Sequence, residues 1–311
     1  MLRRIVPAVF ATAIVAVSLT ACSSSDAAEV DRGDCSAVLG PGAVTENVVL
    51  LGGHGEDPQI SIPADTEITV TQRSIVDSSG AATGARVADE GSLVSVNYAL
   101  YDQQTGEQLI QSDGFANGDS NEFFIISAEA ANPLSEALRC TVAGERVVLA
   151  ISPGDAAGLS QQLGGTEDAG VIAVFDVNDV SGQSVDGRAL GLPNGFPAVV
   201  TDANGQPGVV LPPRDAPVGS TSAVRIAGDG AEVHADSRLL VQVLIVGWDG
   251  NIVSNTWGQS GPQMLQGEEE AAAGGVNFRS ELTGKKAGSQ VVITEGGDDA
   301  RVIVVDILAV G

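Results

Sequence analysis

Residues 134–155 read LSEALRCTVAGERVVLAISPGD, and residues 278–298 read FRSELTGKKAGSQVVITEGGD. The two stretches share one leucine, an alanine-glycine pair and two adjacent valines at a constant spacing. The matched positions are Leu138, Ala143, Gly144, Val147 and Val148 in the first stretch and Leu282, Ala287, Gly288, Val291 and Val292 in the second. A period of roughly 145 residues is far too long for a solenoid repeat, so it indicates the tandem duplication of a whole small domain.

The sequence around these stretches repeats as well. The first stretch follows VSVNYALYDQQTGEQLIQS (94–112), and the second follows VQVLIVGWDGNIVSNTW (241–257). Each copy then ends in a short apolar segment, VIAVFDV (171–177) or VIVVDIL (302–308). Apolar residues that alternate with polar ones over short runs are typical of half-buried β-strands. Each copy is therefore expected to contain strands, one short helix and further strands.

The helix of the first copy is expected to begin at Pro133, since proline is well tolerated in the first turn of a helix. Leu134 and Leu138 would then lie on one helix face. Strands that surround a single short helix predict an α+β fold with a mostly antiparallel sheet.

Composition sets the class of protein and excludes one class of partner. Of the 311 residues 43% are hydrophobic but only 4% are aromatic, so two globular cores would consist mainly of aliphatic side chains. The formal net charge is −25, with only 15 lysines and arginines. Such a surface repels phosphates, which excludes nucleic acid as a partner. The simplest role of the acidity is to keep the protein soluble.

The N-terminus predicts export and lipid anchoring. Two arginines precede an apolar run from Ile5 to Leu19, and small residues then lead to Cys22. A run of about 15 residues is short for a membrane span of about 20, and it fits a signal peptide. We expect signal peptidase to remove residues 1–21 and the Cys22 thiol to carry lipid, which places the protein outside the cytoplasm on the cell membrane. An ordinary secretory signal is the alternative.

The other two cysteines form an even pair in an oxidising compartment, so Cys35 and Cys140 are expected to form a disulfide. Closing a loop of about 100 residues is worth roughly 4–5 kcal/mol in the chain-entropy model. Gly284 occupies the matching position of the second copy, so the bridge would belong to the first domain alone.

These patterns divide the chain into five parts. We expect a signal peptide (1–21), a lipidated flexible tether with an N-terminal segment (22–57), a first domain (58–180), a linker (181–207) and a degenerate second domain (208–311). The linker is assigned because it is rich in glycine, proline, asparagine and aspartate.

The order of the signals resembles the FKBP-type peptidyl-prolyl cis-trans isomerases. The resemblance covers residues 94–177 and 241–308, and its most specific part is LSEALRCTVAGERVVLAISP. Within the family the chain is most similar to the tandem FKBP-like lipoproteins of actinobacteria. The resemblance implies two FKBP-like domains, each a twisted antiparallel sheet wrapped around one short helix. A pocket between sheet and helix would hold a proline ring.

The resemblance also implies which residues line that pocket. Tyr98 matches the pocket tyrosine of the family and Phe124 matches a strand aromatic, whereas Leu109 and Leu134 replace a phenylalanine and a tryptophan. Two pocket aliphatics become Ala130 and Ala131, and the flap tyrosine becomes Ala157. These smaller side chains offer a proline ring fewer stacking partners. In the second copy Phe278 matches the pocket floor, and the flap is largely deleted.

Two functions follow from the resemblance. One is a membrane-anchored isomerase or foldase that acts on proline-containing exported polypeptides, with activity in the first domain. The other is a non-catalytic FKBP-fold binding or scaffold lipoprotein. A different β-rich adhesin-like or solute-binding fold was a third alternative. No cofactor is required for rotation about a peptide bond. No metal site is expected either, because His54 and His234 lack ligand spacing.

Overall fold

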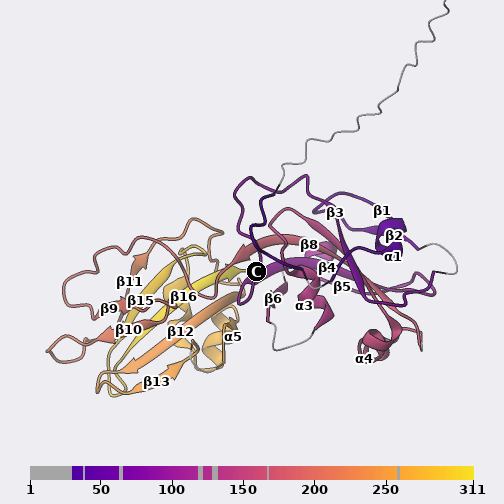
Figure 1. Cartoon of the computed structure of the whole chain (residues 1–311). Coiled ribbons are helices and arrows are strands. Elements are labelled where there is room, and N and C mark those ends of the chain that lie inside the picture. The colour runs from indigo at the N-terminus through magenta and orange to yellow at the C-terminus, as the bar shows by residue number, and fades with distance from the viewer. Residues whose placement is uncertain are drawn as a thin grey trace, which may run out of the picture.

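The chain folds into two antiparallel sheets with a few short helices (Figure 1). The structure is a computed structural model. It describes residues 30–37, 39–62, 66–117, 122–127, 132–166, 168–257 and 260–311. Cys22 and the signal peptide, together with Ala130 and Ala131, lie outside these residues. In the described residues no helix is both long and apolar enough to cross a membrane.

The first sheet has the strand order β3-β7-β8-β4-β5, and β6 also pairs with β4. Its strands are antiparallel throughout, and Tyr98 of β4 lies directly opposite Phe175 of β8. The strands are β3 (Gln72–Asp77), β4 (Leu93–Asp102), β5 (Gln108–Gln111), β6 (Glu122–Ile125), β7 (Arg146–Ile151) and β8 (Val171–Ser181).

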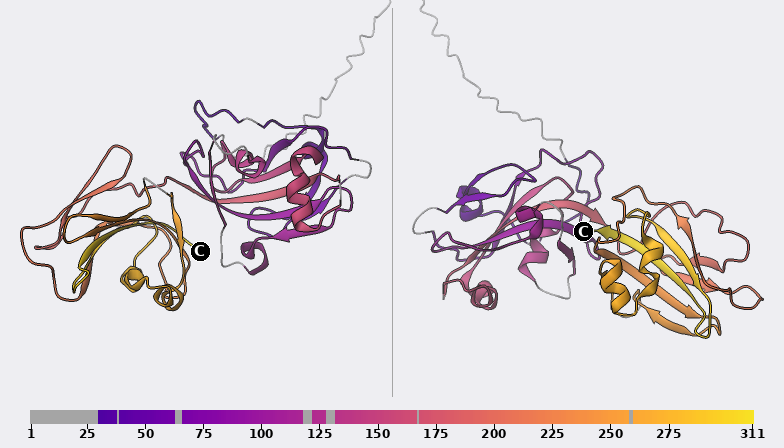
Figure 2. Two further views of the ribbon diagram at one scale, coloured as in Figure 1. Left: turned by 90° about the horizontal axis from the view of Figure 1, so that it is seen from below. Right: turned by 180° about the vertical axis from the view of Figure 1, so that it is seen from behind.

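The second sheet repeats this order strand for strand. Its order is β11-β15-β16-β12-β13, and β14 also pairs with β12. The strands are β11 (Ser220–Ile226), β12 (Leu239–Gly247), β13 (Ile252–Asn255), β14 (Gln263–Leu265), β15 (Gln290–Glu295) and β16 (Arg301–Val310). The repeat in the sequence is therefore a repeat of the whole sheet. Two further views show the domains as separate bodies, purple to pink and orange to yellow (Figure 2).

One face of each sheet, the front face, packs against helices. In the first domain these are α3 (Pro133–Leu138) and α4 (Pro153–Leu163), and in the second it is the 3-10 helix η1 (Asn277–Leu282), beside which α5 (Glu268–Ala273) lies. Helix α3 begins at the proline that the sequence suggested. Its first turn is capped by Asn132, whose side-chain oxygen accepts a hydrogen bond of 3.0 Å from the Leu134 amide.

The opposite, back face of each sheet is covered by a small hairpin. In the first domain β1 (Val49–Leu51) pairs with β2 (Gln59–Ser61), after helix α1 (Ala43–Asn47), and in the second β9 (Ala198–Thr201) pairs with β10 (Pro207–Val210). Leu50 and Ile60 pack on the first back face, and Val199 and Val209 pack on the second.

These hairpins change two sequence-based assignments. Part of the expected tether and N-terminal segment, 22–57, is a packed layer of the first domain, and the end of the expected linker, 181–207, is a layer of the second. Each hairpin lies just ahead of β3 or β11, so the repeated unit includes it. The short strands were not recognised in the sequence because each has only three or four residues and glycine and proline lie close on either side of them.

Helix α4 is a second departure from the sequence analysis, which expected only one short helix in this domain. Pro153 occupies the first turn, and Gly164 ends the helix with a φ of 75°. Proline at the start and glycine at the end are the standard boundaries of a helix. The intervening glycines obscured this pattern.

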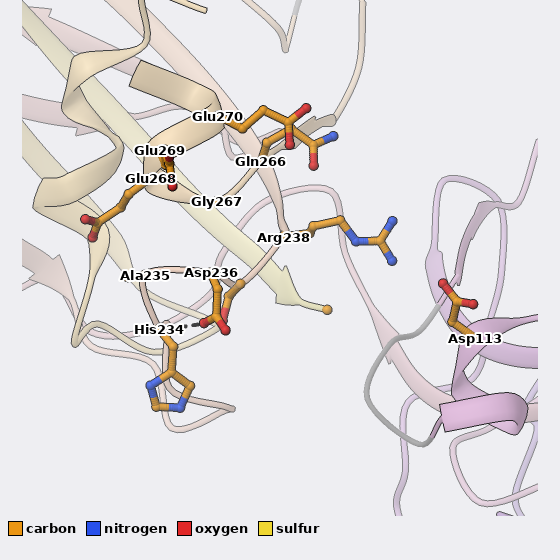
Figure 3. A pocket seen from close by; sticks show the side chains of 12 residues that line it. Asp113, His234, Ala235, Asp236, Arg238, Gln266, Gly267, Glu268, Glu269 and Glu270 are labelled. Atoms are coloured by element: carbon orange, nitrogen blue, oxygen red, sulfur yellow. Dashed lines mark hydrogen bonds between the residues drawn. The ribbon is translucent and has the colours of Figure 1, made fainter. Parts of the chain in front are cut away.

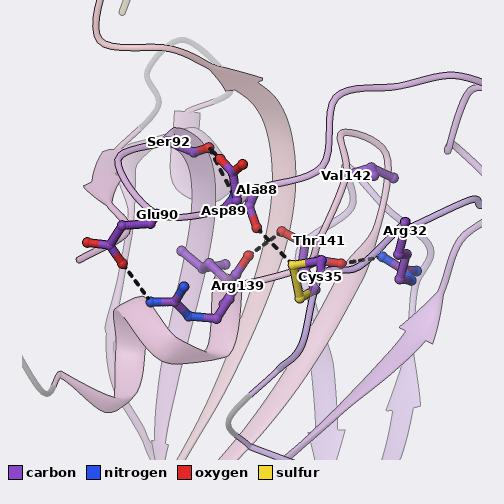
Figure 4. The surroundings of a disulfide bond; sticks show 12 residues. Arg32, Cys35, Ala88, Asp89, Glu90, Ser92, Arg139, Thr141 and Val142 are labelled. Atoms are coloured by element: carbon purple, nitrogen blue, oxygen red, sulfur yellow. Dashed lines mark hydrogen bonds and ion pairs between the residues drawn. A yellow bond between two sulfur atoms is a disulfide. The ribbon is translucent and has the colours of Figure 1, made fainter. Parts of the chain in front are cut away.

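The first domain is closed at its N-terminal side by a disulfide and by contacts of Arg32, and Figure 4 shows the disulfide with the Arg32 side chain beside it. Cys35 and Cys140 are joined by a disulfide with an S–S distance of 2.08 Å. Three residues before Cys35, Arg32 forms an ion pair of 2.5 Å with the buried carboxylate of Glu145 and also donates to the Cys140 carbonyl. Both contacts hold the segment before α1 against the turn that leads into β7.

Candidate functional site

Three aromatic rings form the centre of the front face of the first domain. Tyr98 of β4 lies 6.4 Å from Phe124 of β6 and 6.4 Å from Phe175 of β8, and the two phenylalanine rings are 6.1 Å apart. The Tyr98–Phe124 and Phe124–Phe175 pairs are edge-to-face, an arrangement worth about 0.5–1.5 kcal/mol beyond surface burial. Phe175 is fully buried, whereas Tyr98 and Phe124 are partly exposed, so these two residues of the cluster reach solvent.

Aliphatic side chains surround the rings. Leu109 of β5 and Leu134 of α3 are partly buried against the same core, and Leu159 and Leu163 of α4 join them. The structure therefore brings together the four residues of the first domain that the resemblance implied. The sequence analysis missed Phe175, Leu159 and Leu163. Phe175 is the phenylalanine of VIAVFDV and could have been considered from that strand pattern. Leu159 and Leu163 belong to helix α4, which was not expected.

Helix α4 stands where the family resemblance implies a flap with a tyrosine. Ala157, which matches that tyrosine, is exposed, and Leu159 and Leu163 face the core instead. The end of the helix is fixed by Asp102, whose carboxylate accepts from the amides of Thr166 at 2.6 Å and Thr105 at 2.8 Å. Burial alone would raise the pKa of Asp102, but these hydrogen bonds outweigh burial and lower it to about 2.

The hydroxyl of Tyr98 remains protonated at neutral pH. Burial raises the pKa of Tyr98, and the carboxylates of Glu122 and Asp113 raise it further. The backbone of this residue is held by Ser112, whose hydroxyl accepts from the Tyr98 amide at 2.9 Å and whose own amide donates to the Tyr98 carbonyl. A protonated phenol in a fixed position is a hydrogen-bond donor that a peptide carbonyl could accept from.

The equivalent region of the second domain is filled differently. Phe278 of η1 is only 6% exposed and packs among aliphatic neighbours such as Ile245 and Val276. Val243 stands at the position of Tyr98, because it lies opposite Val305 as Tyr98 lies opposite Phe175, and its amide donates to the Thr256 hydroxyl as the Tyr98 amide donates to Ser112. Strands β15 and β16 are joined by a short turn with an ion pair of 2.6 Å between Arg301 and Glu295, in place of helix α4. Phe278 is thus far from the rings of the first domain and belongs to a separate core.

Among the residues that the structure describes, no group of three or more histidine, cysteine, aspartate or glutamate side chains is arranged to hold a metal ion. The front face presents an apolar surface, the two partly exposed aromatic residues Tyr98 and Phe124, and the phenolic hydroxyl of Tyr98.

Comparisons with known proteins return FKBP-domain structures. No protein-family model matches the chain, and neither does any curated protein. A three-FKBP-domain structure of wheat FKBP73 has a TM-score of 0.31 and 13% identity, covering 78% of this chain and 94% of that one.

Two further structures give similar values. The N-terminal domain of FKBP42 from Arabidopsis thaliana has a TM-score of 0.30 and 11% identity, covering 40% of this chain and 96% of that one. A peptidyl-prolyl cis-trans isomerase from Pseudomonas syringae has a TM-score of 0.27 and 16% identity, covering 36% and 74%. Scores this low establish neither fold nor function, so the proposals below rest on contacts within the chain.

Proposed function

We propose that the chain is an extracytoplasmic FKBP-type peptidyl-prolyl isomerase or foldase, whose first domain acts on proline-containing segments of exported polypeptides. The observation that carries this proposal is the cluster of Tyr98, Phe124 and Phe175 beside an aliphatic wall. A proline ring is compact and apolar, and partly exposed aromatic residues next to leucines are a surface on which it can pack.

Such a surface can speed up rotation about an X-Pro bond without a nucleophile. The planar peptide bond resists rotation with a barrier of about 18–20 kcal/mol because the C–N bond has double-bond character. The twisted transition state loses that resonance, so an apolar surface that excludes water favours it over the planar amide. The Tyr98 hydroxyl, as a protonated donor, would hold the substrate carbonyl.

The isomerase proposal is tested by replacing Tyr98 with leucine, which removes ring and hydroxyl but keeps an apolar side chain. We expect kcat/KM for a proline tetrapeptide to fall about tenfold or more, because transition-state contacts worth at least about 1.4 kcal/mol are lost. The assay is protease-coupled, on the full chain after Cys22. Val243→Leu, at the equivalent position of the second domain, is the matched control and should keep the wild-type rate. A Tyr98→Leu rate equal to wild type would contradict the proposal.

A second candidate is a binding or scaffold protein that does not catalyse rotation. Leu109, Leu134 and Ala157 stand where the family resemblance implies larger aromatic side chains, and Phe278 is buried. The same assay separates the two functions. A wild-type chain with no rate above background that still binds a proline peptide through Tyr98 would be a scaffold.

Anchoring belongs to the same proposal and has its own test. The sequence before Cys22 has the order of a lipoprotein signal, with arginines, an apolar run and small residues. We expect Cys22→Ala to move the protein from the membrane fraction to the soluble fraction after cell lysis. Recovery of the Cys22→Ala variant in the membrane fraction at the wild-type level would contradict lipid anchoring.

A further inference from the structure

The two domains meet near the starts of the equivalent strands β4 and β12. Leu93 opens β4 and Leu240 lies near the start of β12, and both pack in one cluster with Leu308 of β16. Leu93 is paired with Ile125 of β6, and Leu240 is paired with Met264 of β14. The corresponding corners of the two sheets therefore face each other at the domain junction.

An apolar hollow of about 220 Å³ remains at this junction. Its lining includes Leu93, Phe123 and Ile125 of the first domain and Leu240 and Met264 of the second. Ile125 is 39% exposed and Met264 is 44% exposed, so the two corners do not cover each other completely. Exposed apolar side chains gathered around a hollow are a common feature of binding surfaces.

The hollow is next to a larger acidic groove of about 1180 Å³ (Figure 3). Arg238 lines both, and its side chain extends across the gap toward Asp113 of helix α2 (Asp113–Asn117). The carboxylates of the groove are Asp113, Asp236, Glu268, Glu269 and Glu270, and Glu122 adds one at the apolar end. Arg238 and His234 are the basic side chains in these linings, so the groove is strongly negative.

Strand β6 connects this groove to the candidate site. Because side chains of a strand alternate, Phe124 joins the ring cluster while Phe123 and Ile125 face the junction. Glu122 and Asp113 are close enough to Tyr98 to raise its pKa, so carboxylates at the edge of the groove also border the site. A chain that binds in the groove can reach the rings within a few residues.

We propose that the interdomain groove binds the flank of a client segment in extended form, with an apolar residue in the hollow and lysine or arginine beside the carboxylates. This inference rests on the proposed function, since it defines which proline-containing segments the first domain prefers. Charge complementarity selects a basic partner over an acidic one, and it also speeds encounter.

Binding is measured with two fluorescein-labelled peptides that contain one proline and the same apolar residues. One carries lysines, and the other carries glutamates at the same positions. By fluorescence anisotropy on the full chain after Cys22, we expect the lysine peptide to bind about tenfold or more tightly and to lose affinity as salt is raised. Glu269→Lys/Glu270→Lys should remove that preference, and Met264→Asp should weaken binding of the lysine peptide.

The matched control is Asp298→Lys/Asp299→Lys, which changes net charge equally at exposed carboxylates of the β15–β16 turn. It should leave the preference for lysine intact. An equal loss of the preference for the lysine peptide in both charge variants would contradict binding in the groove. So would equal binding of the two peptides, or a dimer in sedimentation that Met264→Asp dissociates, since a second copy would then fill the hollow. Isomerisation of a neutral tetrapeptide, measured in parallel, should be unchanged by the groove variants. If the wild-type chain did not isomerise the neutral tetrapeptide, the isomerase proposal would be contradicted, while the anisotropy result would still test the groove.

Discussion

Asp176→Asn is expected to lower the free energy of unfolding of the first domain by about 3–5 kcal/mol, because it leaves the Arg146 guanidinium buried without its counter-charge. Arg146 and Asp176 are both fully buried on the back face of the first sheet. Their ion pair is bidentate, with Nε at 2.5 Å from one carboxylate oxygen and Nη2 at 2.8 Å from the other.

The pair also holds the hairpin that covers the back face. Arg146 donates to the carbonyls of Gly52 at 2.7 Å and Glu56 at 2.6 Å, and the Gly55 amide donates to Asp176 at 2.5 Å. Losing the carboxylate therefore weakens the contact between the β1–β2 turn and the sheet as well. A neutral asparagine cannot balance the charge, so the guanidinium would have to find water or stay unpaired.

The second domain supplies the matched control, Asp306→Asn. Gln290 stands where Arg146 stands, and its side chain donates to Asp306 at 2.8 Å, so this carboxylate has no directly paired cation. Burial raises the pKa of Asp306 to about 6, although hydrogen bonds from Val185 and Gln290 oppose that rise. A raised pKa means that the ionised group opposes folding at pH 7 and that stability is regained below pH 6. Asp306→Asn should therefore lower the free energy of unfolding by no more than about 1 kcal/mol at pH 7. The variant loses one hydrogen bond, but it also removes the penalty for burying a charged carboxylate.

Urea unfolding can separate the two domains. Both tryptophans, Trp248 and Trp257, lie in the second domain, so their fluorescence follows that domain, whereas far-UV circular dichroism follows both. Asp176→Asn should shift the dichroism transition and leave the fluorescence transition in place. Similar losses for Asp176→Asn and Asp306→Asn at pH 7 would show that the Arg146 charge is not the source of the effect.

The sequence predicted those parts of the fold that depend on repetition and on local chemistry. Because the two copies align at Leu138 and Leu282, and at Gly144 and Gly288, the same strand order in both sheets could be expected. The start of helix α3 at Pro133 could also be predicted, because proline and the preceding asparagine act within the first turn. Tyr98 and Phe124 were found through a resemblance and proved to be neighbours in space.

The rest depends on contacts between distant segments. Nothing local distinguishes Leu50 or Val199 from residues of a loop, and only the sheet behind them makes them a layer. The third ring, Phe175, becomes part of the site because β8 lies beside β4, which a pattern of apolar residues alone does not reveal. The groove at the domain junction requires the placement of two whole domains, and no single segment carries that information.

Removing the disulfide should destabilise the first domain by about 3–5 kcal/mol, since the bond closes a loop between residues that are 105 apart. The change is Cys35→Ala/Cys140→Ala, and the measurement is urea unfolding followed by circular dichroism. Without the disulfide, the segment with Arg32 would still be held by its ion pair with Glu145 and by its hydrogen bond to the backbone carbonyl of residue 140. The second domain should unfold as before by tryptophan fluorescence. A loss below about 1 kcal/mol would mean that the segment is held without the bond.

The residue at position 140 should change how much stability the first domain loses without the disulfide, as comparison with the second copy shows. Cys140 has a φ of 62°, and Gly284 at the equivalent position has a φ of 74°. Left-handed backbone disfavours any residue with a Cβ by about 1 kcal/mol, and glycine avoids this penalty. Cys35→Ala/Cys140→Gly should therefore be about 1 kcal/mol more stable than Cys35→Ala/Cys140→Ala.

The converse change, Gly284→Ala, should destabilise the second domain by a similar amount, because a Cβ there meets no atom within 4 Å and only the backbone conformation is penalised. Equal stability of the two cysteine-free variants, with an unaffected Gly284→Ala, would show that the left-handed turn carries no such penalty in this fold.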